Sequence, residues 1–568
     1  MFRFFLIATI LWMSFCFFSV IYSVDFSSSI YAYLKLSSLL FIFLGSIKQF
    51  DDPENFRLFQ FAVLITCMLH ATLGLMDFFQ EVPIPATWID PNLRDVIKTR
   101  STGVFSDPNI FGGFFSFLIP FLITGFFKVT SGKLEFIWVT GIFLASLAVF
   151  TSFSRGAYIS ALFGILTLIL IRKPTLVMTR KKKIFISLMI VLLIIFFAGP
   201  FKYRMFSIFK PTDMTFSQRT LINNSLFKAV SEVPTFGFGL HSFSQIYPRF
   251  RVVGGDYPLY AHNEYLQIFF ESGPFSLIAF IFMTSSMLTM ILSLVFRKNE
   301  VSLVTSSSCG AFIASLLHNF SSFSTRILPT SSIIALVCAG VFSKEINRDD
   351  SSKSEKRKWL ILFLSAFSIF YLFFCYNCFK VASLLQNATS QLSSGKNNSA
   401  LKLLAEAEKL DSVNPLIFYY RHLVFANTNL PKEAEASLDQ AISVNPDEAL
   451  FILAKARLYK KLNKEGADLF YEKAIKLDPA AEAFRLEYAK FLVEKGKPTA
   501  AIFQLEEALK SSPGFHDVYT TYLDVEKLKK ELLLKVTENE NFASSSITLY
   551  DEKEIASSEV QLKTNLNQ

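Results

Sequence analysis

Seven side chains that bind anions or move protons stand at the ends of apolar runs in this sequence. Arginine carries a planar fork of donors that pairs with oxyanions, and histidine gains or loses a proton near neutral pH. One alone is weak evidence, since an Arg at a membrane edge commonly snorkels and a loop His is commonly polar surface. Seven on one face would form a candidate site for an anionic substrate: Arg100, Arg155, Arg219, His262, Glu271, His318 and Arg326.

Most of these residues belong to short motifs. The first is Arg100-Ser-Thr-Gly-Val-Phe-Ser-Asp-Pro-Asn109, and the second is Ser152-Phe-Ser-Arg-Gly156. A third group runs from Arg219 through Pro234-Thr-Phe-Gly-Phe-Gly239 to His262-Asn-Glu-Tyr-Leu266 and Glu271-Ser-Gly273. The glycines of the third group do not form the Gly-x-Gly-x-x-Gly pattern after a strand, so we exclude a nucleotide-binding loop.

The composition predicts that membrane-spanning helices position these motifs. Of 568 residues, 52% are hydrophobic and 18% charged, with 65 Phe, and the mean hydropathy is +0.39. These values exclude a disordered chain, a collagen, a small disulfide scaffold and a single ordinary soluble domain. Eleven apolar runs approach the length of a spanning helix: 3–22, 29–47, 58–79, 110–127, 134–152, 156–171, 184–200, 274–296, 302–321, 327–343 and 359–379. The run 156–171 is either spanning or re-entrant.

The charge distribution predicts the orientation of these spans. Residues 1–380 contain 33 Lys and Arg against 20 Asp and Glu, and most of the excess lies in alternate short loops. With the N-terminus in the cytoplasm this is a positive-inside pattern. It places loops 80–109 and 201–264, the seven candidate residues and everything after 380 outside. The basic residues therefore give no evidence for nucleic-acid binding. The first run resembles a signal peptide but lacks a convincing cleavage site.

The six cysteines predict no chemistry of their own. They lie in or beside apolar runs, at 16, 67, 309, 338, 375 and 378. None lies in the predicted outside loops or after 380, so no disulfide framework is expected. Cys375 and Cys378 form a Cys-x-x-Cys pair that no second pair completes into a zinc site.

The part of the sequence after residue 380 contains a repeat. Four of its segments end alike and are almost evenly spaced, at Pro415, Pro446, Pro479 and Pro513. The pattern resembles the tetratricopeptide repeat (TPR), which has a period of about 34 residues and stacks helical hairpins into an α-solenoid. We expect a periplasmic TPR domain over 381–537, with a closing helix at 514–537, and a disordered tail over 538–568. The solenoid either binds a protein partner or only stabilises the chain.

The motifs of residues 95–330 together resemble the O-antigen ligase family of bacterial envelope enzymes. The resemblance implies an all-α fold, a polytopic membrane domain over 1–380 with about 11–12 spans and a large periplasmic loop at about 201–264. Members with an appended TPR domain are a variant of the family. The implied location is the bacterial inner membrane.

The same resemblance implies a chemistry. Such enzymes pass a glycan from an undecaprenyl-pyrophosphate carrier to an acceptor hydroxyl, without a metal or another cofactor. Arg155 and Arg219 match the family's functional arginines, and His262 matches its histidine, acting as a base or as part of a phosphate clamp. Glu271 would orient His262 or assist as base. Candidate substrate-binding residues are Arg100, Asn109, Arg249, Arg251, His318 and Arg326; of these, Arg249 and Arg251 either bind the donor or are solvated, and no family motif covers His318 or Arg326.

Several functions remain open at the level of the sequence. The acceptor is a lipid A core in an O-antigen ligase, a growing glycan in an O-antigen polymerase, and a protein in an O-oligosaccharyltransferase. A non-enzymatic polysaccharide exporter or envelope scaffold is the alternative from another class. An exporter would carry charged residues deep inside several spans, whereas the charges here gather at the outer ends, which favours the enzyme.

Overall fold

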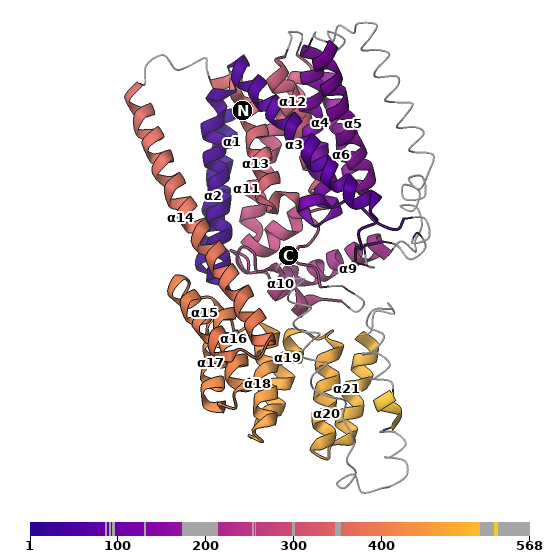
Figure 1. The fold of residues 1–568 in the computed structure, drawn as a ribbon, viewed down its shortest axis with the longest axis vertical. Helices are drawn as coiled ribbons and strands as arrows, with labels where there is room; N and C mark the ends of the chain where they lie inside the picture. Colours follow the sequence, from indigo (N-terminus) through magenta and orange to yellow (C-terminus); the bar gives the residue numbers. More distant parts are fainter. Residues whose placement is uncertain are drawn as a thin grey trace. The chain divides into compact units, whose positions relative to one another are not determined.

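The computed structural model describes the chain as helices joined by short loops (Figure 1). It covers residues 1–50, 52–85, 88–89, 93, 97–129, 132–172, 214–252, 255, 257–297, 301–346, 354–511 and 527–531. Within these residues every regular element is an α-helix or a short 3₁₀-helix and no strand is present. The predicted all-α fold class is therefore confirmed.

The chain divides into two compact units, which do not follow a single cut in the sequence. The membrane unit comprises 1–18, 32–219 and 260–368. The repeat unit comprises 19–31, 220–259 and 369–568, so two segments that precede residue 260 belong with the repeat helices. The boundary predicted at 380 falls inside one continuous helix, α14.

Ten helices correspond to ten of the eleven predicted spans, and the run at 184–200 lies outside the described residues. Eight are long and apolar enough to cross a membrane, whereas α12 and α13 are shorter apolar helices. The chain is thus a multi-pass membrane protein. The helices are α1 (Phe2–Ile21), α2 (Phe26–Gln49), α3 (Pro53–Phe79), α4 (Pro108–Lys128), α5 (Gly132–Thr151), α6 (Arg155–Arg172), α11 (Glu264–Val295), α12 (Leu303–His318), α13 (Leu328–Ile346) and α14 (Ser354–Ser393).

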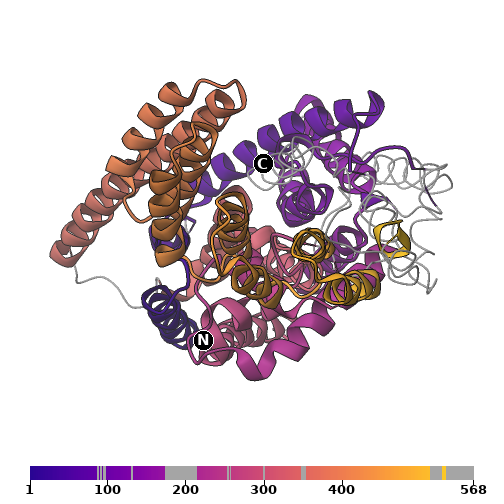
Figure 2. The same cartoon turned by 90° about the horizontal axis from the view of Figure 1, so that it is seen from below.

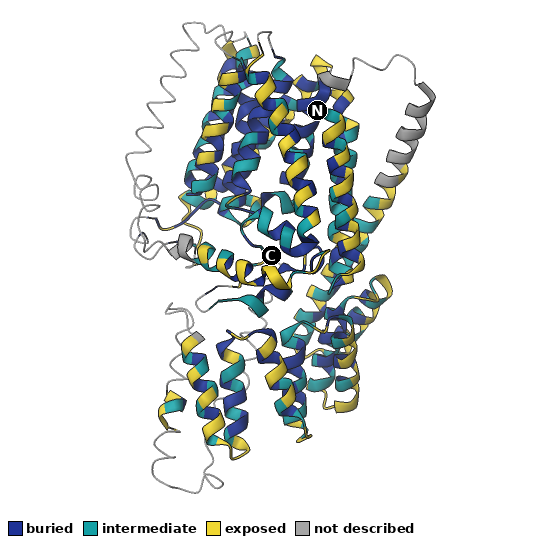
Figure 3. Ribbon diagram, turned by 180° about the vertical axis from the view of Figure 1, so that it is seen from behind, coloured by how far each residue is buried: buried dark blue, intermediate teal, exposed yellow. Residues whose placement is uncertain are grey.

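Helix α4 forms the centre of the membrane unit and is buried along most of its length. Glycines permit its neighbours to come close. A Cβ on Gly125 would lie 2.3 Å from the Trp138 ring of α5. Between α6 and α12, a Cβ on Gly164 would lie 2.9 Å from the carbonyl oxygen of Gly310. Helices in lipid have no hydrophobic driving force to associate, so close van der Waals packing at small residues holds such crossings together. Exposed residues lie on other faces of the helices (Figure 3).

The repeat unit contains the predicted helical hairpins (Figure 2). Consecutive hairpins begin one repeat period apart, since α16 starts at Pro415 and pairs with α17, and α18 starts at Ala449 and pairs with α19. Alanines such as Ala441 and Ala474 are fully buried and allow the helices to pack closely. The seven helices are α15 (Asn397–Leu410), α16 (Pro415–Asn427), α17 (Pro431–Val444), α18 (Ala449–Lys461), α19 (Ala467–Leu477), α20 (Glu482–Glu494) and α21 (Pro498–Ser511).

The described part of the predicted loop at 201–264 contains short helices. Its elements are α9 (Met214–Ala229), η7 (Val230–Glu232), α10 (Phe243–Ile246) and η8 (Tyr247–Phe250). Two further short 3₁₀-helices, η3 (Gly103–Phe105) and η9 (Ser324–Arg326), flank candidate residues in the membrane unit. Of the predicted closing helix at 514–537 only 527–531 is described, and it is helical. The predicted tail at 538–568 lies outside the described residues.

Candidate functional site

Arg100 is buried and ties the first motif to the second. Its Nε donates to the carbonyl oxygen of Ser152 at 2.8 Å, Nη1 to that of Trp88 at 3.1 Å, and Nη2 to Oδ1 of Asn109 at 3.2 Å. A guanidinium with three such acceptors is held in one position. Arg100 therefore shapes the site from within, and Asn109 is oriented by it.

The remaining residues of the first motif build the start of α4. Oδ1 of Asp107 accepts hydrogen bonds from the backbone N–H groups of Asn109 and Ile110, at 2.7 and 3.0 Å, which caps the helix. Pro108 follows at the first helical position, where its missing N–H costs nothing. Ser106 adopts a left-handed conformation with φ of 51°. The Asp-Pro-Asn sequence thus has a local structural reason, and it fixes the direction of the Asn109 carbonyl.

The second motif is a tight turn between α5 and α6. The backbone N–H of Ser101 donates to the carbonyl oxygen of Thr151 at 2.9 Å, which binds the first motif to this turn. Phe153 is left-handed, with φ of 49°, and Arg155 is the first residue of α6. A non-glycine residue in this conformation is strained, and such strain concentrates at functional sites. The turn places Arg155 at the same end of the helices as Arg100.

His318 is fully buried at the end of α12 and joins the first two motifs. Its Nε2 lies 3.0 Å from the carbonyl oxygen of Asn109, and because a carbonyl only accepts, Nε2 carries the proton. Gly113 and Gly156 make room for the ring. A Cβ on Gly113 would lie 2.3 Å from Nε2, and one on Gly156 would lie 3.3 Å from Nδ1. The closest atom to a Cβ on Gly156 would be Oγ of Ser321, at 2.1 Å, so the glycine of Ser-x-Ser-Arg-Gly allows this turn to pack against the residues that follow α12.

His262 lies directly before α11 in a left-handed conformation, with φ of 51°. Its ring meets the edge of Phe323, with centroids 5.0 Å apart, and its Nδ1 is buried without a hydrogen-bond partner in the described part of the chain. Burial, and then the positive charge of Arg219, lower the pKa of His262 from 6.5 to about 3. The unliganded site therefore holds a neutral imidazole that can accept a proton.

Arg219, near the middle of α9, links the two histidines electrostatically. Its positive charge acts on both His262 and His318. Arg219 is half-buried and has interactions of its own within the protein. A guanidinium whose charge reaches two histidine side chains combines a cation with groups that can exchange protons. This is the combination required to hold an anionic leaving group while a hydroxyl is deprotonated.

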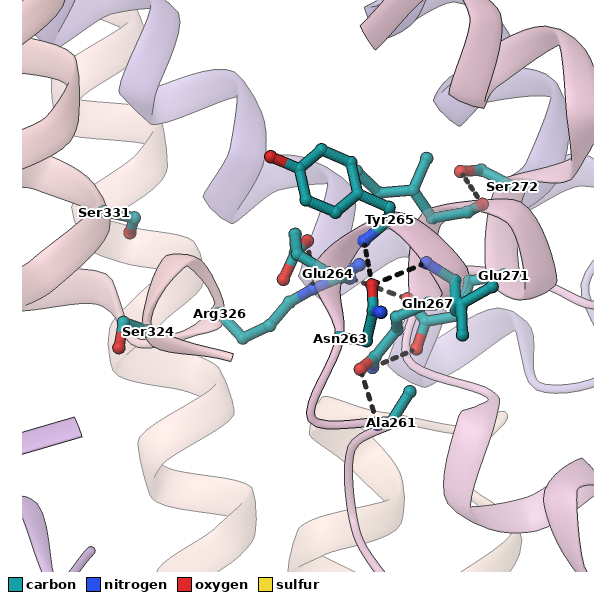
Figure 4. A network of polar contacts seen from close by, with 12 residues as sticks. Ala261, Asn263, Glu264, Tyr265, Gln267, Glu271, Ser272, Ser324, Arg326 and Ser331 are labelled. Atoms are coloured by element: carbon teal, nitrogen blue, oxygen red, sulfur yellow. Dashed lines mark hydrogen bonds and ion pairs between the residues drawn. The ribbon is translucent and has the colours of Figure 1, made fainter. Parts of the chain in front are cut away.

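Arg326 and two carboxylates of α11 form a buried ionic network (Figure 4). Nε of Arg326 lies 2.8 Å from Oε1 of Glu264, and Nη1 donates to Oε2 of Glu271 at 2.6 Å. Nε2 of Gln267 donates to the other oxygen of Glu271 at 3.0 Å, and the backbone N–H of Ala261 donates to Oε1 of Gln267 at 2.9 Å. Glu271 is thus connected through Gln267 to the backbone of Ala261, which directly precedes His262.

Three residues of this network were not among the candidates named from the sequence, although Glu264 lies within the third group of motifs. Glu264 and Gln267 lie on α11, and Nζ of Lys35 donates to the carbonyl oxygen of Arg326. Glu264 precedes Glu271 by two helical turns, a spacing that puts both on one helix face. Lys35 stands within the apolar run 29–47, and a charge inside a span is by itself a sign of function. Both signals were available in the sequence.

Arg249 and Arg251 belong to the repeat unit, where acidic residues of the repeat helices bind them. Nη1 of Arg249 lies 3.6 Å from Oδ1 of Asp447. Nη2 of Arg251 lies 3.3 Å from Oδ1 of Asp478. The structure therefore groups two sets of candidates. The membrane unit contains Arg100, Asn109, Arg155, Arg219, His262, Glu271, His318 and Arg326, and the repeat unit contains Arg249 and Arg251.

No metal centre is formed by the residues that the structure describes. Within them, no three His, Cys, Asp or Glu side chains are arranged to hold a metal ion. All six cysteines are described and free, and Cys375 and Cys378 form no disulfide.

Comparison with known proteins identifies part of this arrangement. Residues 140–281 match the family model described as O-antigen ligase. That segment contains Arg155, Arg219, His262 and Glu271. No curated protein matches the chain. Among solved structures, the crystal structure of the yeast Tom70 is similar at 11% sequence identity and a TM-score of 0.24, over 74% of this chain and 93% of that chain.

Proposed function

We propose that this chain, of which residues 140–281 match the O-antigen ligase family model, transfers a glycan from a polyprenyl-diphosphate carrier to an acceptor hydroxyl. One observation supports the proposal above others. The positive charge of Arg219 acts on His262, whose buried Nδ1 has no partner among the described residues. A buried ring nitrogen that has no partner and feels the charge of a nearby arginine suits the deprotonation of a hydroxyl next to an anionic leaving group.

The reaction forms one bond and breaks one. The oxygen of the acceptor hydroxyl attacks the anomeric carbon of the glycan, and the bond from that carbon to the diphosphate oxygen breaks. The proton of the hydroxyl passes to His262, and the polyprenyl diphosphate leaves with the bonding electrons. Because diphosphate is a good leaving group, the protein needs cations to hold its charge more than it needs a strong acid.

Each residue then has a proposed role. Arg155 and Arg219 hold the diphosphate, and His262 is the base. Glu271 orients the His262 loop through Gln267. Arg100, Asn109, His318 and Arg326 shape the pocket from behind, through the hydrogen bonds that they make within the protein.

The proposed location is the inner membrane of a bacterium. The N-terminus would be cytoplasmic, because the Lys and Arg residues of alternate short loops then all face the cytoplasm. The candidate site and the repeat helices would face the periplasm, where a lipid-linked glycan is available. Cysteine labelling from the periplasmic side at exposed His241, after replacement of native cysteines, tests this orientation. Labelling only from the cytoplasmic side would contradict it.

We propose a lipid A core as the acceptor, as in an O-antigen ligase. A polymerase and a protein O-oligosaccharyltransferase would use the same donor clamp. Glycolipid gels of a deletion strain distinguish the three. Loss of polymer from a normal core supports the ligase, a single repeat on the core indicates the polymerase, and a mass shift confined to proteins indicates the oligosaccharyltransferase.

The direct test is transfer by purified protein in lipid vesicles that contain a polyprenyl-diphosphate glycan and acceptor, with a chelator present. We expect the lipid-linked glycan to be consumed, and Arg219→Ala and His262→Ala each to lower turnover by about 100-fold or more. Arg297→Ala and His241→Ala are matched controls at exposed positions. Full activity in the first two variants would contradict the proposed roles, and absence of turnover in wild type would favour the exporter or scaffold.

A further inference from the structure

Equivalent residues directly follow three alternate helices of the repeat unit. Asp411, Asn445 and Asp478 follow α15, α17 and α19, one repeat period apart. Each has an extended backbone, and its N–H donates at 3.0 Å to the carbonyl oxygen of an alanine one helical turn earlier. The three side chains therefore repeat with the solenoid along one edge. We call Asp411, Asn445 and Asp478 the cap row.

Every member of the cap row binds a segment that precedes residue 260. Oγ of Ser27 donates to Oδ2 of Asp411 at 2.7 Å. Nδ2 of Asn445 donates to Oε1 of Gln245 at 3.2 Å. Asp478 accepts from Arg251, and also from Tyr257, whose hydroxyl lies 2.6 Å from Oδ2.

The contact at Asp478 is the most enclosed of the three. The side chains of Arg251 and Asp478 are only 5% and 4% exposed. The guanidinium carbon of Arg251 lies 3.8 Å from the centre of the Tyr257 ring, and its Nη1 donates to the carbonyl oxygen of Gly255 at 2.8 Å. Removing one partner of such a pair leaves a buried charge uncompensated, which is strongly unfavourable.

The bound segments also hold each other. Nε2 of Gln245 donates to Oδ2 of Asp25 at 2.8 Å, and the backbone N–H of Val24 donates to the carbonyl oxygen of Phe238 at 3.0 Å. Oγ of Ser29 donates to the carbonyl oxygen of Leu240 at 2.6 Å. The cap row, residues 24–29 and the described residues of 238–257 thus make one continuous polar network.

We propose that the cap row positions the loop 245–257 and, through it, His262, so that Asp478 is a positioning residue for the transfer reaction. Tyr257 closely precedes His262 in the sequence, and the left-handed backbone of His262 requires that the incoming chain be held. Because the cap row already binds this protein's own loops, a protein partner would use another face of the solenoid. The catalytic consequence rests on the proposed function, whereas the docking of the loop does not.

The test uses the full-length protein and Asp478→Asn, with Asp468→Asn as the matched control. Asp468 lies on the same helix, α19, but its side chain is 43% exposed and its nearest cation, Lys497, is 3.8 Å away. The first readout is the rate of tryptic cleavage after Arg251, which must leave its enclosure to enter the protease. We expect at least about tenfold faster cleavage in D478N, as follows from breaking a buried pair, and wild-type cleavage in D468N. Arg251→Gln is the second variant, because it leaves the repeat helices untouched; its readout is turnover alone.

The second readout is transfer. We expect both D478N and R251Q to lower kcat by about tenfold or more with the KM for the donor unchanged, since a misplaced base slows the chemical step. In an H262A background D478N should cause no further loss of the residual turnover. Unchanged cleavage in D478N overturns the proposal, and so does faster cleavage with unchanged kcat. If wild type transfers nothing, the proposed function fails, while the cleavage rates still decide whether the cap row holds the loop.

Discussion

Nε2 of His318 donates to the carbonyl oxygen of Asn109 at 3.0 Å, and this hydrogen bond joins α12 to α4, which lie far apart in the sequence. Gly113 allows this bond, because a Cβ at that position would occupy the space of the imidazole ring. The bond connects the Asp-Pro-Asn end of the first motif to the end of α12. It also fixes the orientation of the buried His318 ring.

The first prediction concerns Gly113. A Cβ there would lie 2.3 Å from Nε2 of His318, so Gly113→Ala should displace the ring, destabilise the fold by about 1–3 kcal/mol and lower turnover. Gly45→Ala is the control, since a Cβ on Gly45, within α2, would meet nothing within 4 Å. Thermal unfolding in detergent and the transfer assay measure both effects. A G113A protein as stable and as active as G45A would contradict the packing argument.

The second prediction concerns Arg326. Arg326→Met removes the cation that Glu264 and Glu271 share and should destabilise the protein by about 3–5 kcal/mol, as for other broken buried pairs. Arg297→Met, at an exposed arginine, should leave the unfolding temperature unchanged. Equal unfolding temperatures for R326M and R297M would mean that the network contributes nothing to stability.

The third prediction separates the two carboxylates of α11. Glu271 reaches Ala261 through Gln267, whereas Glu264 contacts Arg326 without this connection. Glu271→Gln should therefore lower kcat more than Glu264→Gln, even where both lose similar stability. Turnover and unfolding temperature, measured on the same preparations, decide the matter. A larger loss of kcat in E264Q would show that the connection through Gln267 does not position His262.

The sequence predicted the helices of the membrane unit well, because the cause is local. A backbone in hydrocarbon must satisfy its own hydrogen bonds, so a long apolar run becomes a helix of about its own length. The run 110–127, for example, is the helix Pro108–Lys128. The hairpins of the repeat were equally predictable, since each repeat contains a proline at nearly the same spacing.

The partners of the charged residues were harder to predict, because their cause is not local. Arg251 finds Asp478, 227 residues later, and nothing in the residues around either one specifies the other. Arg326 likewise takes its carboxylates from α11, where Glu271 lies 55 residues before it. Because these side chains are charged, the sequence predicted that they would need partners when buried. Which partners lie within reach is determined only by the fold.

The fourth prediction follows from the electrostatics of His262. Burial and the charge of Arg219 lower its pKa to about 3, so the imidazole of the free enzyme stays neutral down to that pH. If His262 is the base, kcat/KM for the donor should not fall between pH 7 and pH 5, because kcat/KM reports the free enzyme. His241→Gln, at an exposed histidine, should give the same profile. An acid limb with its midpoint between pH 6 and 7 in both proteins would contradict a neutral His262.

The last prediction concerns Glu482, the first residue of α20, beside the cap row. Burial raises the pKa of Glu482 from 4.5 to about 7, with Arg251 opposing this rise and Asp478 adding to it. The unfolded chain thus ionises Glu482 before the folded protein does. The stability that Glu482 contributes is complete below pH 4.5 and is lost as the pH rises to about 7, by about 1–2 kcal/mol because solvent screens part of the effect. Unfolding of the full-length protein, followed from pH 5 to pH 8, should show this loss in wild type and in Glu465→Gln, whose side chain is exposed, but not in Glu482→Gln. An identical pH dependence in all three proteins would mean that Glu482 ionises in the folded protein as it does in water.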